Sequence, residues 1–303
     1  MRAILMTVTL TGMLFGSAVC AADGDLAQTE REYRTAMREG ARFAREGQNA
    51  RALARFKRAV QLKPRSPQAH FRVALTYLDR GLYMAAEENA RKATYLDSGF
   101  APAWLVLGSA LFHQDREQEA VSPLQRAFRL DNTSAHAAYM LGRAYYFLPA
   151  KDRDKREDYR RALEYFQQAL RLKSSYTEAR FMEGCCFLEL DLPEPARQSF
   201  IATLRDDPDN PEVYFRLALC ELRTQRYLDA ESYLRAALQK APQHPEAHLF
   251  LADLLWDHLG DREQAALHYR RYLGAAPDDH AARGRVERRL EDAGIAPDAG
   301  TRF

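Results

Sequence analysis

Residues 101–134, APAWLVLGSALFHQDREQEAVSPLQRAFRLDNTS, decide the fold, because their pattern recurs along the chain at intervals of 34 residues. Seven segments share the pattern and start at Tyr33, Pro67, Ala101, Ala135, Thr177, Pro211 and Pro245. The eighth position of each segment is small: Gly40, Ala74, Gly108, Gly142, Gly184, Ala218 and Ala252. The twentieth is alanine once eight extra residues are allowed in the fourth segment and one in the seventh: Ala52, Ala86, Ala120, Ala162, Ala196, Ala230 and Ala265. A fixed period of this length indicates a repeat protein.

Two further columns show how each segment folds. The twenty-fourth position is large and apolar except once: Phe56, Ala90, Leu124, Phe166, Phe200, Leu234 and Tyr269. The thirty-second position is a helix stopper or turn former: Pro64, Ser98, Asn132, Ser174, Pro208, Pro242 and Pro277. Apolar residues at positions 4, 7, 8 and 11, and again at 20, 24 and 27, have helical spacing. Each segment is therefore predicted to form two amphipathic helices that bury their apolar sides by stacking on their neighbours.

These columns resemble the tetratricopeptide-repeat family, and Trp104, Leu107 and Gly108 match its opening signature best. The resemblance implies an all-α fold, a right-handed α-solenoid of about seven tetratricopeptide helix pairs. The predicted repeats are 33–66, 67–100, 101–134, 135–176, 177–210, 211–244 and 245–279. Small residues at positions 8 and 20 are expected to let the two helices of a pair cross closely.

Local signals indicate where individual helices begin and turn. Ser66 and Asn210 each precede a proline and are suited to cap the following helix. Gly47 and Gly81 suit the tight turn within a repeat.

The repeats are expected to be flanked by three further segments. Residues 280–294 are predicted to form a C-terminal capping helix that covers the last repeat with Ala282, Val286 and Leu290. Residues 23–32 are polar and are interpreted as a linker, and residues 295–303 as a loose tail.

The first 22 residues have the layout of a secretory signal peptide, with Arg2, an apolar run and a small-residue stretch before Asp23. Cleavage there predicts a periplasmic protein. An uncleaved membrane anchor is one alternative, although the apolar run is short for a bilayer. Another is a lipidated N-terminus at Cys20, which would attach the protein to the outer membrane. Arginine outnumbers lysine by 37 to 7, as is typical of high-GC bacterial genomes.

The composition excludes several classes of partner and site. A net charge of +2 gives no long-range attraction to nucleic acid, so no nucleic-acid partner is expected. Contact with a membrane is expected only through a lipid or through another protein. Repeats and capping helix fill the chain, and no phosphate loop, nucleophile elbow or paired-cysteine zinc pattern is present. We therefore expect no enzyme activity, no cofactor and no metal.

Cysteines and histidines were the remaining candidates for chemistry. Cleavage of the signal peptide would remove Cys20 and leave an odd number of cysteines, Cys185, Cys186 and Cys220, which are predicted to be buried thiols. Cys185 and Cys186 are adjacent, so on a helix they point about 100° apart and suit neither a disulfide nor a shared metal. His244 and His248 lack a third ligand with zinc spacing and are expected to be unconnected.

The family resemblance implies that the first helix of each pair lines a concave surface, chiefly through positions 2, 5, 9, 12 and 13. The residues predicted to form a partner-binding groove are Phe71, Leu75, Leu78, Leu105, Phe112, Tyr139, Arg143, Tyr146, Phe181, Leu188, Phe215, Leu219, Leu222 and Trp256. The lysine and asparagine with which relatives grip acidic chaperone termini are absent at positions 5 and 9. An apolar channel better suits a hydrophobic or amphipathic peptide or helix. The alternative is that these side chains only fill space between repeats.

Three hypotheses about function remain open at this point. The leading one is a periplasmic scaffold or adaptor that binds an apolar segment of one or more proteins in the groove. The second is an outer-membrane lipoprotein, lipidated at Cys20, that assists assembly of a pilus or a polysaccharide-secretion machine. The third is an accessory enzyme subunit that uses the histidine and cysteine positions. The charged insertion at 149–159 is interpreted as a solvated loop or helix extension, or else as a second docking edge.

Overall fold

The computed structural model describes residues 25–149, 155–277 and 281–296, and within these ranges it contains helices and no strand. The predicted all-α fold is confirmed. The predicted signal peptide and Cys20 lie outside the described residues. The chain divides into two compact units, Met1–Pro149 and Ala150–Phe303, and the division falls between the two helices of the fourth repeat.

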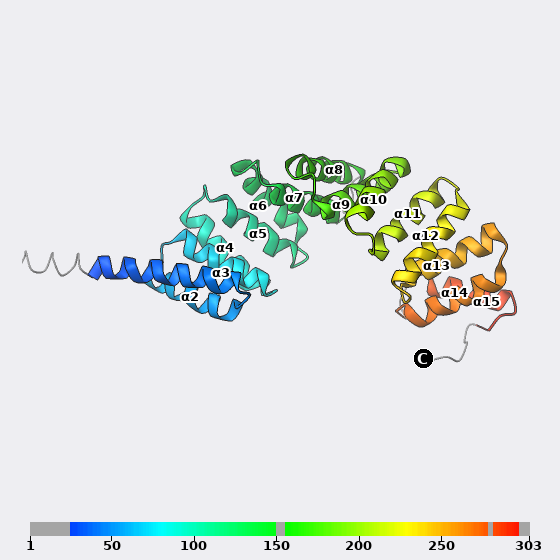
Figure 1. The fold of residues 1–303 in the computed structure, drawn as a ribbon, viewed down its shortest axis with the longest axis horizontal. Helices are drawn as coiled ribbons and strands as arrows, with labels where there is room; N and C mark the ends of the chain where they lie inside the picture. Colours follow the sequence, from blue (N-terminus) through cyan, green and yellow to red (C-terminus); the bar gives the residue numbers. More distant parts are fainter. Residues whose placement is uncertain (1–24, 150–154, 278–280, 297–303) are drawn as a thin grey trace, which may run out of the picture. The chain divides into compact units, whose positions relative to one another are not determined.

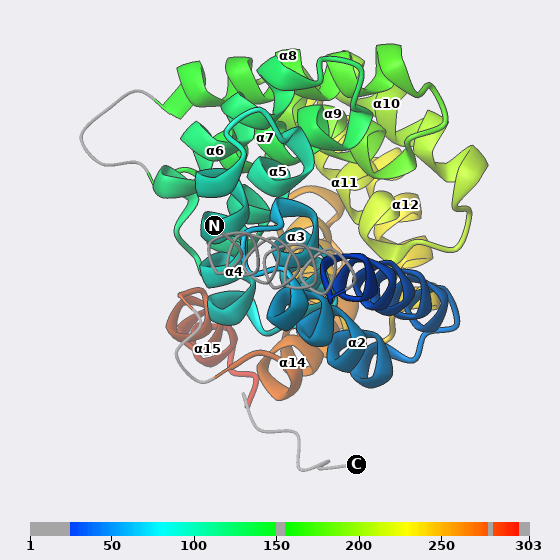
Figure 2. The same cartoon turned by 90° about the vertical axis from the view of Figure 1, so that its left-hand side faces the viewer.

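The first unit is a succession of helix pairs (Figure 1). Its helices are residues 25–45, α2 (Asn49–Leu62), α3 (Pro67–Asp79), α4 (Tyr83–Leu96), α5 (Ala101–Phe112), α6 (Glu117–Leu130) and α7 (Ala135–Phe147). Figure 2 shows the helix of residues 25–45, in dark blue, beside α2.

Residues 25–32, expected to be a linker, are instead the beginning of the first helix. Arg34 pairs with Glu30 one turn earlier at 2.7 Å, and Arg58 of α2 pairs with Glu32 at 3.1 Å. The first pair has the i, i+4 spacing that supports a helix, and the second ties this polar stretch to α2. The polar composition therefore concealed a helix rather than indicating a linker.

The second unit continues the pattern of pairs and ends in a single helix. Its helices are α8 (Lys155–Leu172), α9 (Thr177–Glu189), α10 (Pro193–Asp206), α11 (Pro211–Arg223), α12 (Tyr227–Lys240), α13 (Pro245–Leu254), the π-helical turn η1 (Leu255–Leu259), α14 (Arg262–Ala275) and α15 (Arg283–Asp292). At 18 residues α8 is longer than α10 and α12, which have 14 each, so the described end of the charged insertion belongs to this helix.

The predicted caps and turns are present. The Ser66 hydroxyl accepts a hydrogen bond from the Ala69 N–H at 3.1 Å, and the Asn210 side chain accepts one from the Glu212 N–H at 3.1 Å. Gly47 and Gly81 have φ of +71° and +70°. The same fifteenth position has positive φ in three repeats without glycine, at Asp115, Asp191 and Gln225. The turn geometry is thus shared even where the residue type does not reveal it.

Glycines at position 8 make room for the side chain at position 24. A Cβ atom added at three of them would collide with that side chain, at 2.6 Å for Gly40 and Phe56, 2.4 Å for Gly108 and Leu124, and 2.7 Å for Gly184 and Phe200. The small residues at position 8 were predicted to let the two helix backbones of a pair approach each other. In the structure, the space next to these glycines is occupied mainly by the buried side chain at position 24.

A hydrogen bond between successive repeats was not predicted. The side chain at position 4 donates to the backbone carbonyl at position 32 of the preceding repeat, in the pairs His70–Pro64, Trp104–Ser98, Arg180–Ser174, Tyr214–Pro208 and His248–Pro242. Each bond satisfies a carbonyl left free near a helix end. We call this contact the position-4 latch. The interpretation of position 4 as simply apolar was wrong, because chemically different donors share the role.

The extra residue in the seventh repeat forms the π-helical turn η1, which follows α13 directly and ends at Gly260 with φ of +74°. A single inserted residue in a helix is commonly absorbed in this way. The extra residue was detected in the sequence, but the π-helical turn that it forms was not predicted.

Helix α15 packs on the last repeat with Val286 and Leu290, both fully buried. Ile295, placed by the sequence in the loose tail, packs against the same core. Arg270 donates two hydrogen bonds to the carbonyl of Ala296, at 3.1 and 3.0 Å. The chain therefore stays on the protein surface as far as residue 296.

Candidate partner-binding site

The predicted groove residues are distributed over both units. The first unit carries Phe71, Leu75, Leu78, Leu105, Phe112, Tyr139, Arg143 and Tyr146, and the second carries Phe181, Leu188, Phe215, Leu219, Leu222 and Trp256. None of them is fully exposed. Phe112, Leu188 and Phe215 are buried, with exposed fractions of 7%, 3% and 5%, and the others are half-buried.

In the second unit the aromatic groove positions take part in packing. The Phe215 ring lies 5.5 Å from Phe250 and 5.0 Å from His244, measured between centroids. The Phe181 ring lies 5.7 Å from the buried Phe200 ring. The Phe215–Phe250 contact joins successive repeats, whereas the Phe181–Phe200 contact lies within one repeat. Phe215 in particular is an interior residue.

In the first unit, aromatic side chains gather at positions 12 and 13 of the third and fourth repeats. We define the aromatic cluster as Phe112, His113, Arg143, Tyr146 and Phe147. The Phe147 centroid lies 5.9 Å from that of Phe112 and 4.9 Å from that of Tyr146, both edge to face. The Arg143 guanidinium lies 4.4 Å from the Phe112 centroid. Aromatic pairs of this kind contribute about 0.5–1.5 kcal/mol each beyond area burial, so the rings hold one another in place.

Phe147 distinguishes this cluster from the rest of the predicted groove. Its side chain is 46% exposed, and among the described residues it is the one exposed large apolar side chain at positions 2, 5, 9, 12 or 13, which were expected to line the concave surface. Phe147 was not among the predicted groove residues, although position 13 belonged to the expected surface and its neighbour Tyr146 was predicted. An exposed ring backed by other rings offers a binding surface that needs little reorganisation.

His113 behaves as an aromatic ring rather than as a cation. It stacks on Tyr83, with centroids 5.0 Å apart and planes 15° apart. Partial burial, and then the positive charge of Arg143, lower the pKa of His113. The imidazole is therefore neutral near pH 7, and the one formal charge of the aromatic cluster is Arg143.

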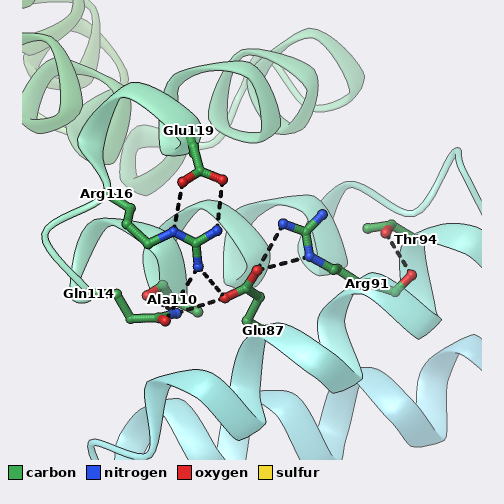
Figure 3. Close-up of polar contacts among 7 residues, drawn as sticks. All are labelled: Glu87, Arg91, Thr94, Ala110, Gln114, Arg116 and Glu119. Carbon is green, nitrogen blue, oxygen red and sulfur yellow. Dashed lines mark hydrogen bonds and ion pairs between the residues drawn. The ribbon is translucent and has the colours of Figure 1, made fainter.

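A polar network directly after His113 fixes the turn between α5 and α6 (Figure 3). Arg116 donates two hydrogen bonds of 2.7 Å to Glu119 and a third of 2.7 Å to Glu87 of α4. Gln114 also donates to Glu87, at 2.9 Å. Burial raises the pKa of Glu87, but the hydrogen bonds from Gln114 and Arg91 and the charge of Arg116 lower it further, so the carboxyl group stays ionised. The network ties the end of α5, and with it Phe112 and His113, to the preceding repeat.

The three predicted thiols are free and buried. Burial raises the pKa of Cys185 and Cys220 to about 12 and raises the pKa of Cys186 as well. All three are protonated at neutral pH, whereas a nucleophilic or metal-binding cysteine is a thiolate.

His244 and His248 have separate roles, as expected, but each has a partner that was not foreseen. His244 caps α13 by accepting a hydrogen bond from the Ala247 N–H at 3.4 Å. His248 Nδ1 lies 2.9 Å from His268 Nδ1, and His248 Nε2 donates to the Pro242 carbonyl. In the neutral pair His268 is therefore the donor to His248. Burial lowers the pKa of both rings, that of His268 to about 4.

The described residues contain neither a metal-binding cluster nor a membrane-spanning helix. No group of three or more histidine, cysteine, aspartate or glutamate side chains in ranges 25–149, 155–277 and 281–296 is arranged to hold a metal ion. No helix in those ranges combines the length and apolar character needed to cross a membrane.

The repeat pattern matches a known family along most of the chain. The model of the tetratricopeptide repeat matches residues 37–99, 74–135, 147–194, 187–245 and 221–280. The chain belongs to the tetratricopeptide-repeat family. Membership supports a role in protein–protein interaction, with proteins or peptides as partners.

Individual tetratricopeptide-repeat relatives are distant. The small glutamine-rich tetratricopeptide repeat-containing protein 2 of Mycosarcoma maydis is 32% identical over 80 residues, which is 26% of this chain and 23% of that protein. The type IV pilus assembly protein PilF of Pseudomonas aeruginosa is 24% identical over 178 residues, or 58% of this chain and 68% of PilF. A solved structure of Pseudomonas aeruginosa PilF superimposes with a TM-score of 0.60 at 20% identity, over 75% of this chain and 97% of that one. The structural likeness shows a shared fold.

Proposed function

We propose that this tetratricopeptide-repeat protein is a periplasmic scaffold that binds an apolar or amphipathic segment of another protein through the aromatic cluster. The observation that carries the proposal is Phe147, an exposed aromatic ring on the expected binding face, supported from behind by Phe112 and Tyr146. The half-buried side chains at positions 5 and 9, including Tyr139 and Leu105, extend this surface along the first helices of neighbouring repeats.

The proposal includes export and excludes catalysis. The signal-like layout of residues 1–22 supports export to the periplasm. The protonated, buried thiols and the capping and paired histidines have structural roles, which supports a chain that binds and does not catalyse. The small net charge supports a protein partner over nucleic acid.

A second candidate is an outer-membrane lipoprotein, lipidated at Cys20, that assists assembly of a pilus. The similarity to PilF, a type IV pilus assembly protein, favours this candidate. Both candidates use the same binding surface and differ in whether Cys20 is retained. Labelling of cells with a radioactive fatty acid separates them, because label on the mature chain that is lost in a C20S variant supports the lipoprotein, and unlabelled mature chain supports the soluble scaffold.

Affinity capture from the cell envelope tests the binding surface. Phe147→Glu places a charge where an apolar segment would pack and is expected to abolish recovery of the partner. Tyr95→Glu is the matched control, since Tyr95 is an aromatic residue of α4 that is 89% exposed and lies on a second helix of a pair. Circular dichroism should be unchanged for both variants. Equal loss of capture in both, or retained capture in F147E, would refute the proposal.

A further inference from the structure

The C-terminal end of the second unit contains a hollow that the proposed function does not use. It has a volume of about 440 Å³ and is lined by Trp256, Arg262, Arg285, Arg288, Arg289 and Asp292, among others. These residues come from η1, α14 and α15, so the hollow exists only because the capping helix has packed on the seventh repeat. Trp256 lies in the π-helical turn η1, and such turns occur often at functional sites.

Two of the four arginines are neutralised within the protein. Arg285 donates to both carboxylate oxygens of Asp253, at 3.0 and 2.8 Å. Arg289 donates to Asp253 at 3.1 Å, to Asp257 at 2.6 Å and to the Tyr269 hydroxyl at 2.7 Å. These bonds fix both guanidinium groups as walls of the hollow.

The other two arginines keep unused hydrogen-bond donors. Arg262 lies over the Trp256 ring, 5.5 Å from its centroid, and forms no ion pair with a described residue. Arg288 likewise forms no ion pair or hydrogen bond within the described ranges, and its residue is exposed. A guanidinium group stacked on an indole loses less freedom when it binds a carboxylate, and its planar donors match the two carboxylate oxygens.

We propose that this hollow, which we call the Arg–Trp site, binds an extended acidic peptide segment of a partner protein. Arg262 and Arg288 receive a carboxylate. The guanidinium groups of Arg262 and Arg289 lie 5.5 and 5.6 Å from the Trp256 centroid, and an apolar side chain of the peptide packs on the part of this half-buried residue that they leave exposed. This is a second site, separate from the aromatic cluster and independent of the proposed function.

The charge balance favours one or two carboxylates over a polyanion. Four arginines face the carboxylates of Asp253, Asp257 and Asp292, so the excess is a single positive charge. Nucleic acid and anionic membranes are bound by larger positive surfaces that neutralise many charges at once. A short peptide with an acidic and an apolar side chain matches both the charge and the indole ring of Trp256 in the lining.

Tryptophan fluorescence of the full chain provides a direct probe. The sequence has two tryptophans, Trp104 and Trp256. Trp104→His leaves Trp256 as the single tryptophan and keeps a position-4 donor, because His70 and His248 already serve in that latch. The W104H protein is titrated with a synthetic nine-residue peptide of alternating glutamate and leucine, and with the same peptide carrying glutamine for glutamate.

The expected result is a saturable change in Trp256 emission with the glutamate peptide only. R262Q together with R288Q should weaken binding at least tenfold, equivalent to about 1.4 kcal/mol. Arg129→Gln together with Arg205→Gln removes the same charge from two exposed arginines on other helices and should change binding less than about twofold. Asp292→Asn removes a competing carboxylate and should tighten binding about twofold or more.

Several outcomes would overturn the Arg–Trp site. One is equal binding of the glutamine peptide, and another is unchanged affinity in the R262Q/R288Q protein. A third is arginine-dependent binding to phosphatidylglycerol vesicles in the absence of any binding to the glutamate peptide. Retained helicity in circular dichroism shows that the variants are folded, since Arg262 and Arg288 make no structural ion pair with the described residues.

Discussion

Gly184→Ala is expected to destabilise the second unit, although alanine is the better helix former. Gly184 lies inside α9, where alanine is favoured over glycine by about 1 kcal/mol. The added Cβ would lie 2.7, 2.8 and 2.9 Å from three ring atoms of Phe200, which is fully buried. Overpacking of this kind costs about 1–3 kcal/mol. The net expectation is a loss of up to about 2 kcal/mol in the free energy of unfolding.

A matched control and a rescue isolate the cause. Gly274→Ala, in α14, meets no atom within 4 Å and should stabilise by about 0.4–1 kcal/mol. Combining Gly184→Ala with Phe200→Leu imitates the sixth repeat, where Ala218 and Leu234 occupy positions 8 and 24 and are both fully buried. The double variant should be more stable than the two single losses added together, by about 1–2 kcal/mol.

The assay is urea unfolding of the full chain followed by far-ultraviolet circular dichroism. The free energies of Gly184→Ala, Phe200→Leu and the double variant form a cycle whose coupling measures the contact between positions 8 and 24. Two results would contradict a collision between positions 8 and 24. One is that Gly184→Ala stabilises the chain as much as Gly274→Ala does, and the other is that the losses of Gly184→Ala and Phe200→Leu are simply additive.

Three further predictions concern a hydrogen bond between repeats, a buried histidine pair and the buried thiols. Tyr214→Phe removes one position-4 latch and should lower stability by about 0.5–1.5 kcal/mol, whereas Tyr95→Phe on the surface should change nothing in the same urea assay. The stability that His268 contributes should be complete above about pH 6.5 and be lost towards pH 4, because the pKa of His268, normally 6.5, is about 4 in the folded state and the unfolded chain takes up the proton first. His268→Asn, which copies the His70–Asn89 pair, should remove about 3 kcal/mol of this dependence, measured as urea midpoints across that range; an unchanged slope would contradict it. Ellman's reagent should react with Cys185, Cys186 and Cys220 only after denaturant is added, and rapid reaction of the folded chain would show that the thiols are accessible.

The sequence predicted those parts of the fold that depend on residue size and spacing. Some positions have a single physical role and can therefore be recognised from the sequence alone. They are the small residues at positions 8 and 20, the proline and serine residues at helix boundaries and the two turn glycines. The buried thiols followed from their number and helical spacing. Helical periodicity alone was enough to exclude a sheet.

Features that depend on a hydrogen bond to a backbone atom, or on a pair of opposite charges, were harder to predict. The position-4 latch uses His, Trp, Arg and Tyr as donors to one carbonyl, and no single residue type marks it. Residues 25–32 form a helix through paired charges, which a search for apolar stripes does not detect. Burial also depends on neighbours from other repeats, which is why Phe215 and Phe147 share the expected face but differ in exposure, at 5% and 46%.

Photocrosslinking in living cells tests the proposed binding surface most directly. A photoreactive phenylalanine at position 147 is compared with the same residue at position 95, on a first and a second helix respectively. We predict a discrete protein adduct from position 147, lost when Arg143 and Tyr146 are both replaced by glutamate, and little or no adduct from position 95. An adduct from position 95 alone, or equal adducts from both positions, would contradict binding at the aromatic cluster.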